Sequence, residues 1–438
     1  MRRIPTTVVA TGLQVSGMTS RPRVLVIAEA ANPEWVSVPL IGWSLSQSLQ
    51  EVADTHLVTQ VRNRDAILRA GLSEGRDFTA IDSEAISRPL FRVAQVLRMG
   101  QGKGWTMTTA LNALSYPYFE RLVWQQFGKD LMAGRYDIVH RVTPLTPTTV
   151  SPLARKCAKV GVPFVMGPLN GGVPWPPGFD SERRREHEWL SYVRGVYRLL
   201  PGRGRMLNAA AAIIAGSRHT ASEIPQKFAH KVHYLPENAV DSARFNRTSA
   251  QNVSGPLRAV FIGRLVPYKG LDMAIAAAQP HLASGAMHLD VIGDGPMRTA
   301  LEQQVAENGL AGSVTFHGQL PHEQVQDVAV EANILLFPSI REFGGGVVLE
   351  AMSLGIVPVI VDYAGPSELV TPETGYAVPI GQRAQIIERL SNTLSGLVAD
   401  PNVLVDMGAR ARARVEAHFT WSQKARDIAA IYEAVRKA

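Results

Sequence analysis

The strongest constraint on the fold is an alternation of short apolar runs with segments of helical periodicity along most of the chain. This alternation is typical of βαβ units, in which parallel strands are joined by crossover helices. Two series of runs are present, at 24–28, 56–61, 136–140, 163–166 and 212–215, and at 257–263, 288–293, 314–317, 334–338 and 357–361. The pattern predicts an α/β protein with two parallel sheets.

The length of 438 residues exceeds what one ordinary hydrophobic core fills, so we expect two domains with a cleft between them. The polar stretch at 241–256 has no strand pattern and separates the two series. We predict a disordered tail at 1–20, an N-terminal domain at 21–245, a C-terminal domain at 246–420 and a last helix at 421–438. The first series also carries long insertions, at about 65–135 and 170–207.

Composition narrows the classes of function. The single cysteine, Cys157, excludes an intrachain disulfide and favours a reducing, cytoplasmic compartment; it reads as a buried apolar side chain rather than a catalytic thiol. A formal charge of +7 favours an anionic partner. Because no helix-turn-helix, zinc-finger or RNP signature is present, we expect no nucleic-acid partner, and nucleotide diphosphates or acidic lipids fit the charge. No apolar stretch is long enough to span a bilayer.

Several functional candidates directly follow predicted strands, where parallel sheets bind ligands. Gly263 and Arg264 follow one strand, and Lys269 lies five residues further along. A guanidinium and an ammonium at this spacing can together hold a diphosphate, although alone they would equally suit a solvated surface. Gly293 and Gly295 follow the next strand of the second series.

The segment 341–350 favours the interpretation as a ligand site. Three glycines, Gly344, Gly345 and Gly346, follow Glu342, so the backbone can approach a ligand closely and present its amides. A helix is expected to begin near 347 and to run to 354, which places Glu350 about one turn inside it. A carboxylate there can accept hydrogen bonds from a ribose diol. A favourable helix-dipole charge at Glu350 and a solvated loop carboxylate at Glu342 are the alternatives.

The order of motifs in the second half resembles a known family. GRLVPYKG (263–270), VIGDGP (291–296), FHGQLP (316–321) and FPSIREFGGGVVLEAMSLGIVPVIVDYAGPSELV (337–370) are similar to the retaining glycosyltransferases of family 4. The turn at 236–241 resembles the family's PNGVD turn, with Ala239 at the usual glycine. The resemblance implies the GT-B fold, in which two Rossmann-like domains face each other across a cleft and the last helix crosses back to the N-terminal domain.

The resemblance also implies residue roles. Arg264 and Lys269 would bind the donor diphosphate and stabilise the departing nucleotide, and Glu342 would hold the transferred sugar, so these three are the catalytic candidates. The implied donor site comprises Gly263, Arg264, Lys269, Gly293, Gly295, His317, Gly318, Leu320, Glu342, Phe343, Gly344, Gly345, Gly346 and Glu350, with Glu350 on the ribose and 317–320 near the base.

The first half matches the family more loosely. Glu29 follows the first strand and His140 ends another, and both are candidates for the acceptor side. His140 also suits a core position, since Val142 stands where the family has a second histidine. Gly171 and Gly172 follow a further strand and are assigned to the acceptor side, although a Gly/Pro-rich loop without a ligand explains them equally well.

These features predict transfer of a hexose-type sugar from a UDP- or GDP-sugar to a glycan, lipid-linked or small-molecule acceptor, with retention implied by the resemblance. An inactive nucleotide-sugar-binding scaffold, or another GT-B enzyme such as an epimerase or a phosphorylase, is the alternative. Basic and apolar residues mix at 91–105 and 183–205, which suggests peripheral contact with the anionic inner face of a membrane. Solvated helix faces explain the same composition.

The chain has no D-x-D motif and no convincing His/Cys cluster, so we expect neither a metal nor another cofactor. Arg264 and Lys269 would then neutralise the diphosphate in place of a metal. We predict that EDTA leaves the rate of nucleotide release from a sugar donor unchanged. Loss of activity in EDTA that Mg²⁺ restores would contradict this expectation.

Overall fold

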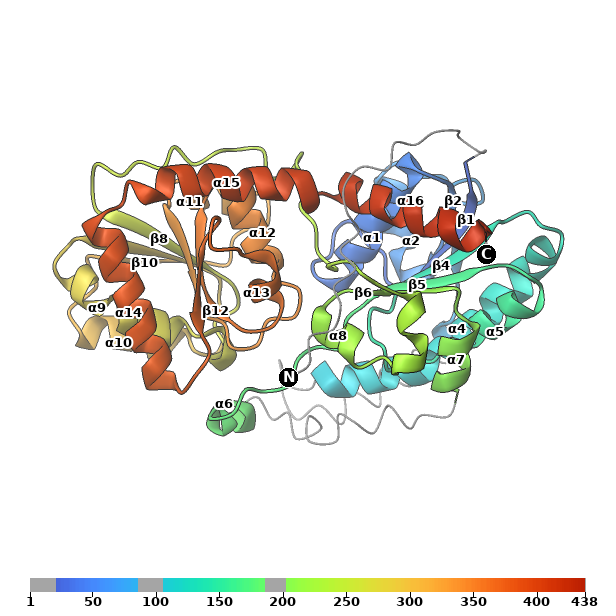
Figure 1. Cartoon of the computed structure of the whole chain (residues 1–438), viewed down its shortest axis with the longest axis horizontal. Coiled ribbons are helices and arrows are strands. Elements are labelled where there is room, and N and C mark those ends of the chain that lie inside the picture. Colours follow the sequence, from blue (N-terminus) through green and yellow to red (C-terminus); the bar gives the residue numbers. More distant parts are fainter. Residues whose placement is uncertain (1–20, 86–104, 186–201, 438) are drawn as a thin grey trace.

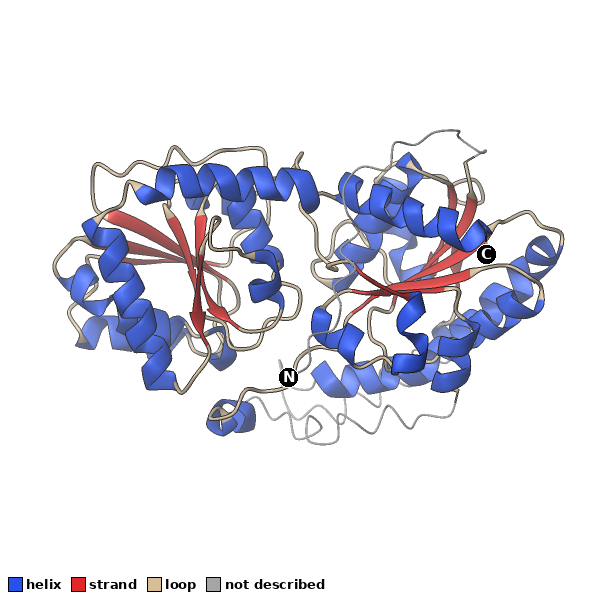
Figure 2. Ribbon diagram, viewed as in Figure 1, coloured by secondary structure: helices blue, strands red, loops and turns tan. Residues whose placement is uncertain are grey.

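The computed structural model describes residues 21–85, 105–185 and 202–437, which form two parallel sheets in separate lobes (Figure 1). The tail predicted at 1–20 lies outside the described residues, as do most of the basic and apolar residues at 91–105 and 183–205. Helices lie on both faces of each sheet (Figure 2), as expected for crossover connections between parallel strands.

The first sheet has the strand order β3-β2-β1-β4-β5-β6-β7. Its strands are β1 (Arg23–Ala28), β2 (Asp54–Gln60), β3 (Phe78–Ile81), β4 (Ile138–Thr143), β5 (Phe164–Leu169), β6 (Ala212–Ala215) and β7 (Val232–Tyr234). The accompanying helices are α1 (Val38–Ser48), α2 (Arg64–Arg69), α4 (Trp105–Met132), α5 (Pro152–Lys159), α6 (Asp180–Arg185), α7 (Arg203–Ala209) and α8 (Arg218–Ser222), with 3₁₀ turns η1 (Leu49–Glu51), η2 (Val61–Asn63) and η4 (Gln226–Lys231). The winding direction reverses between β1 and β4, which is where such sheets open a crevice.

Both faces of this sheet are buried, which explains why its central strands are continuous apolar runs. Leu25 and Ile27 of β1 pack in one core with α4, α5 and α7. Val24 and Val26 point to the opposite face and pack in a second core with α1 and the last helix of the chain. Successive residues of a single strand thus anchor two different helical layers.

The second sheet has the order β10-β9-β8-β11-β12-β13, and its direction of winding reverses between β8 and β11. Its strands are β8 (Leu257–Ile262), β9 (Met287–Ile292), β10 (Val314–Gly318), β11 (Ile334–Phe337), β12 (Val357–Asp362) and β13 (Tyr376–Pro379). The helices are α9 (Leu271–Ala283), α10 (Arg298–Glu307), α11 (Val325–Ala329), α12 (Gly346–Ser353), α13 (Gly365–Leu369), α14 (Arg383–Ala399) and α15 (Val403–His418), with the 3₁₀ turn η5 (Pro267–Lys269). The crevice of this sheet therefore opens beyond β8 and β11.

The last helix, α16 (Trp421–Lys437), lies against the first lobe although it directly follows α15 of the second (Figure 1). Ile428, Ile431 and Tyr432 are buried in the core that α1 and β1 share. The prediction that this helix crosses back to the N-terminal domain is confirmed.

The apolar runs locate ten of the described strands but miss β3, β7 and β13, which all lie at sheet edges. An edge strand has a neighbour on one side only, so fewer of its side chains need to be apolar. No residue of Val232–Tyr234 in β7 is fully buried, and β13 buries only Val378. Hydrophobicity alone therefore gives little indication of either strand.

A buried polar contact joins α16 to the first sheet. The hydroxyl of Tyr432 donates to Nδ1 of His140 over 2.6 Å, and Nε2 of His140 donates to the carbonyl of Gly167 over 2.8 Å. Burial lowers the pKa of His140 to about 4, which keeps the ring neutral and leaves Nδ1 free to accept.

We predict that Tyr432→Phe weakens the docking of α16 by about 1–3 kcal/mol, because a buried acceptor on His140 is left without a donor. The measurement is native-state hydrogen exchange of the α16 amides, which should speed up in the variant. Glu433→Gln, an exposed change one residue along, is the control and should leave exchange unchanged. Equal protection in Tyr432→Phe and the wild type would show that the hydroxyl contributes nothing.

Candidate functional site

The candidate donor residues gather at the point where the second sheet reverses its winding. Lys269 follows β8 and Glu342 follows β11, and their charged groups form an ion pair between these two strand ends. The Lys269 ammonium also lies 4.9 Å from the ring centre of Phe337, at the end of β11. The two paired side chains are only 16% and 18% exposed, so the pair is largely shielded from solvent.

Arg264 differs from Lys269 in its surroundings. Its side chain is exposed, and no hydrogen bond, ion pair or ring contact engages its guanidinium within the described part of the chain. Arg264 lies on the loop that leads from β8 to Lys269, so its uncommitted guanidinium leaves positive charge available at the same end of the sheet, with the fork geometry that suits phosphate oxygens.

The three consecutive glycines differ in what their backbone conformation and surroundings require. Gly345 has a φ of 64°, a left-handed conformation that favours glycine, and it caps α12. A Cβ on Gly344 would lie 2.1 Å from Nδ2 of Asn238 and 2.3 Å from Oε1 of Glu237, so the linker between the lobes occupies that space. Gly346 begins α12 and meets only Asn238 at ordinary contact distance.

The helix after the glycines matches the sequence prediction. It runs over Gly346–Ser353 and ends before Gly355, with Val348, Leu349 and Met352 fully buried. Glu350 lies just beyond its first turn, and its Oε1 is 2.9 Å from Nε2 of His322. This hydrogen bond raises the pKa of His322, a residue that the sequence analysis did not single out.

Gly293 and Gly295 bring two strand-end loops together. A Cβ on Gly293 would lie 2.0 Å from the carbonyl oxygen of Gly263, and one on Gly295 would lie 2.5 Å from that of Leu265. The backbone of the β9 loop thus rests directly on the backbone of the β8 loop. Their glycines are required by this close approach, whatever else they bind.

The 317–320 loop is anchored to the same sheet. Nε2 of His317 lies 2.8 Å from Oδ1 of the buried Asp290, and the carbonyl of Gly318 accepts from the amide of Gly293 over 2.7 Å. Leu320 is partly buried against the core of the second lobe. The donor candidates from Gly263 to Glu350 therefore lie together beyond the carboxyl ends of the strands of the second sheet.

A segment of the first lobe reaches over these strand ends. Trp175 stacks edge-on against Tyr268 at 6.2 Å, and the guanidinium of Arg341 lies 5.0 Å from the Trp175 ring and 5.2 Å from that of Phe343. Phe179, four residues along, is buried in the hydrophobic core of the second lobe. The sequence analysis missed this contact; the clustered prolines and aromatics of 173–179 were the available signal.

The linker that enters the second lobe contains a buried acid beside the donor loop. Glu237 is 6% exposed, and burial raises its pKa to about 7, with the carboxylates of Glu342 and Glu368 adding to the shift. Burial lowers the pKa of Lys424, at the start of α16, to about 7 as well, and its ammonium donates to the carbonyl of Pro236. The sequence analysis identified the turn at 236–241 but gave Glu237 no role.

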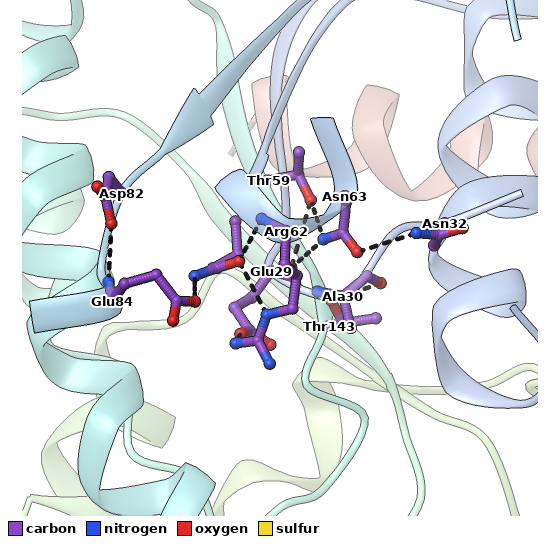
Figure 3. A network of polar contacts seen from close by, with 10 residues as sticks. Glu29, Ala30, Asn32, Thr59, Arg62, Asn63, Asp82, Glu84 and Thr143 are labelled. Carbon is purple, nitrogen blue, oxygen red and sulfur yellow. Dashed lines mark hydrogen bonds and ion pairs between the residues drawn. The ribbon is translucent and has the colours of Figure 1, made fainter. Parts of the chain in front are cut away.

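Glu29, an acceptor-side candidate, is part of a polar network at the end of β1 (Figure 3). Its carboxylate forms a 2.8 Å ion pair with Arg62, and its carbonyl accepts from Nδ2 of Asn63 over 2.9 Å and from the hydroxyl of Thr59. Burial raises the pKa of Glu29, and the charge of Arg62 opposes that shift. The contacts bind the end of β1 to the turn after β2.

The other acceptor-side candidates differ in whether they are buried in the core or lie on a loop between the lobes. His140 is fully buried and commits both ring nitrogens to Tyr432 and Gly167, so its ring offers no surface to an acceptor in this structure. Gly171 and Gly172 lie where the chain leaves β5 towards Trp175, and the amide of Gly171 donates to the hydroxyl of Thr220. Gly172 has a φ of 71° and turns the chain towards the second lobe.

Within the described ranges, no helix combines the length and apolar content needed to cross a bilayer. In the same ranges, no three histidine, cysteine, aspartate or glutamate side chains gather as a metal site would require.

Comparison with known proteins assigns the second lobe to a family and the whole chain to a fold. Residues 243–414 match the family described as glycosyl transferases group 1. A putative colanic acid biosynthesis glycosyltransferase, WcaL of Salmonella typhimurium, is 27% identical over 266 residues, which are 59% of this chain and 63% of that protein. A mannosyltransferase of Corynebacterium glutamicum, whose name describes it as GDP-mannose-dependent, is 32% identical over 36% of this chain and 42% of its own length.

Solved structures match over nearly the entire chain. Sucrose-phosphate synthase of Thermosynechococcus elongatus aligns with a TM-score of 0.62 and 17% identity over 95% of this chain and 99% of its own. HepE of Anabaena, solved with UDP and glucose, aligns with a TM-score of 0.58 and 16% identity over 94% and 100%. Residues 243–414 therefore form a glycosyl transferases group 1 domain, as in family 4 glycosyltransferases, and the chain as a whole has the GT-B fold.

Proposed function

We propose that the protein transfers a hexose-type sugar from a nucleotide-sugar donor to an acceptor, with retention of configuration as the resemblance to family 4 implies. The observation that carries this proposal is the crevice beyond β8 and β11. There the uncommitted guanidinium of Arg264, the Lys269–Glu342 pair and the glycine loop before α12 come together at one sheet edge.

Charge distribution supports a diphosphate in this crevice. Glycosyl transfer develops negative charge on the departing nucleotide while the sugar becomes oxocarbenium-like, so the site must stabilise both. Arg264 would bind the diphosphate from the solvent side, and Lys269 from the inner side. Glu342, held in place by Lys269, would then face the sugar with the amides of the glycine loop.

The nucleoside would lie further along the same edge. Glu350 presents a carboxylate that His322 orients over 2.9 Å, and a carboxylate in the first turns of a helix suits a ribose diol. The loop of His317 to Leu320 would border the base. HepE was solved with UDP-glucose, and the C. glutamicum relative is named for GDP-mannose, so both nucleotides are candidates for this chain.

The acceptor is left open as a glycan, a lipid-linked sugar or a small molecule. A role in polysaccharide biosynthesis is supported by the name of the WcaL relative, which refers to colanic acid, and by that of a further relative, the amylovoran biosynthesis glycosyltransferase AmsK of Erwinia amylovora. The direct test is release of UDP or GDP from a panel of nucleotide sugars. An inactive scaffold would bind a donor and release nothing, and an epimerase would convert the sugar without a transferred product.

We predict that Arg264→Gln weakens binding of the matching nucleoside diphosphate about ten- to hundredfold, because a charge-assisted hydrogen bond contributes about 1.5–3 kcal/mol. Isothermal titration with UDP and with GDP is the measurement. Arg410→Gln, an exposed arginine on α15, is the matched control and should bind as the wild type does. An unchanged affinity in Arg264→Gln would remove this residue from the donor site.

We predict that Glu342→Gln lowers turnover about a hundredfold or more, because the proposed role puts this carboxylate against the sugar, where charge develops in the transition state. The melting temperature should fall as well, because Gln keeps the shape of the side chain but leaves the Lys269 ammonium without its counter-charge, so turnover is compared at a temperature where the variant is fully folded. Glu331→Gln, an exposed change before β11, controls for loss of charge. Turnover within twofold of the wild type would show that Glu342 does not act on the sugar.

A further inference from the structure

A second recess lies between the two lobes, separate from the donor residues. Its volume is about 480 Å³, which is in the range of small-ligand pockets. Val173, Pro174, Arg218 and His219 form its wall on the first lobe. Tyr363, Ser367 and Arg414 are among the residues that form its wall on the second.

Two arginines from opposite lobes line this recess, and neither is paired with an acid. The guanidinium of Arg218 lies 5.0 Å from the ring centre of Tyr234. Nε of the half-buried Arg414 donates to the carbonyl of Leu369 over 3.0 Å, and its guanidinium lies 5.3 Å from the Phe419 ring. Within the described part of the chain, no carboxylate lies within ion-pair distance of either guanidinium.

The one acidic side chain among the lining residues already has partners. The carboxylate of Glu368 accepts from the backbone amide of Arg218 over 2.9 Å and from the hydroxyl of Tyr234 over 2.8 Å. Burial raises the pKa of Glu368, and its hydrogen bonds to Tyr234 and to the Arg218 amide oppose that shift. The recess therefore keeps an excess of positive charge. Arg414 is half-buried with no carboxylate within ion-pair distance, which is unfavourable for a guanidinium, and an anionic ligand would relieve it.

The wall formed by α13 is attached to the donor loop. The amide of Gly365 donates to the carbonyl of Glu342 over 3.2 Å, and a Cβ on Gly365 would lie 2.2 Å from the carbonyl of Phe343. The opposite wall belongs to the segment that carries Trp175 over the site. An occupant of the recess thus contacts the lobe expected to bind the acceptor and also lies beside the loop expected to hold the sugar.

We propose that this recess binds an anionic group of the acceptor, a carboxylate or a phosphate, between Arg218 and Arg414. The identification of the ligand as the acceptor rests on the proposed function, whereas the binding of an anion rests on the geometry of the recess alone. A hydrogen-bonding fork from each lobe suits an oxyanion with at least two free oxygens. Because the two arginines belong to different lobes, an anion bound between them also favours a closed arrangement of the lobes.

The test uses the full chain and three probes that differ in charge: glucuronate, glucose 6-phosphate and glucose. Binding is measured by isothermal titration with the donor site filled by UDP or GDP, so that a phosphate probe cannot occupy it. The variants are Arg218→Gln with Arg414→Gln, each change alone, and Arg410→Gln as the control on the same helix. A melting curve for each variant confirms that it is folded.

We expect at least one anionic probe to bind the wild type and Arg410→Gln more tightly than glucose does. The same probe should bind the double variant at least tenfold more weakly than it binds the wild type. Binding of glucuronate alone would identify a carboxylate, and binding of glucose 6-phosphate alone a phosphate. Equal affinity of the double variant and the wild type would overturn the proposal, as would glucose binding as tightly as both anions, or no anionic binding in the millimolar range.

Donor binding in the same variants separates this proposal from the proposed function. The double variant should bind the nucleoside diphosphate as the wild type does, because neither arginine belongs to the donor residues. A wild type that binds no nucleotide and no nucleotide sugar would contradict the proposed function. Binding of the anionic probes would still test whether the recess holds an anion.

Discussion

The arrangement of the candidate site depends on a short backbone contact where the chain crosses between the lobes. The amide of Val240 donates to the carbonyl of Phe419 over 2.8 Å, so the two crossing strands of chain run side by side. These two adjacent crossings form the hinge that joins the lobes. Glu237 and Asn238 precede this contact and lie against Gly344, so the hinge and the donor loop share a surface. A change in the angle between the lobes would therefore displace the loop before α12.

The charges at this hinge have a positional role rather than a stabilising one. Removing a carboxylate and an ammonium from water opposes their mutual attraction, and burial moves the pKa of Glu237 up and that of Lys424 down to about 7. Two buried charges that attract each other without a direct ion pair add little to the free energy of folding. They do hold Pro236 and the start of α16 at one spacing, because the Lys424 ammonium also donates to the Pro236 carbonyl. That spacing sets how closely Glu237 approaches the glycine loop.

The sequence predicts what depends on local pattern and does not predict what depends on packing between distant segments. Central strands such as β1 and β8 are buried on both faces, so their apolar runs are unambiguous. The boundaries of α12 follow from the glycines at each end. The edge strands β3, β7 and β13 carry no such pattern. The Lys269–Glu342 pair could be anticipated in part, since both residues follow strands that flank one reversal of winding.

The same reasoning explains why the sequence predicts the donor side of the molecule better than the proposed acceptor side. Donor candidates follow successive strands of one sheet, and parallel strands bring their ends to one edge whatever the connecting helices contain. The proposed acceptor side is built by segments that no periodicity links: Trp175 contacts Arg341 across the lobes, and Arg218 and Arg414 line the recess from opposite lobes. Contacts of this kind depend on the angle between two separately folded lobes. A site shared by both lobes can therefore change its chemistry through a few side chains while the donor crevice remains the same.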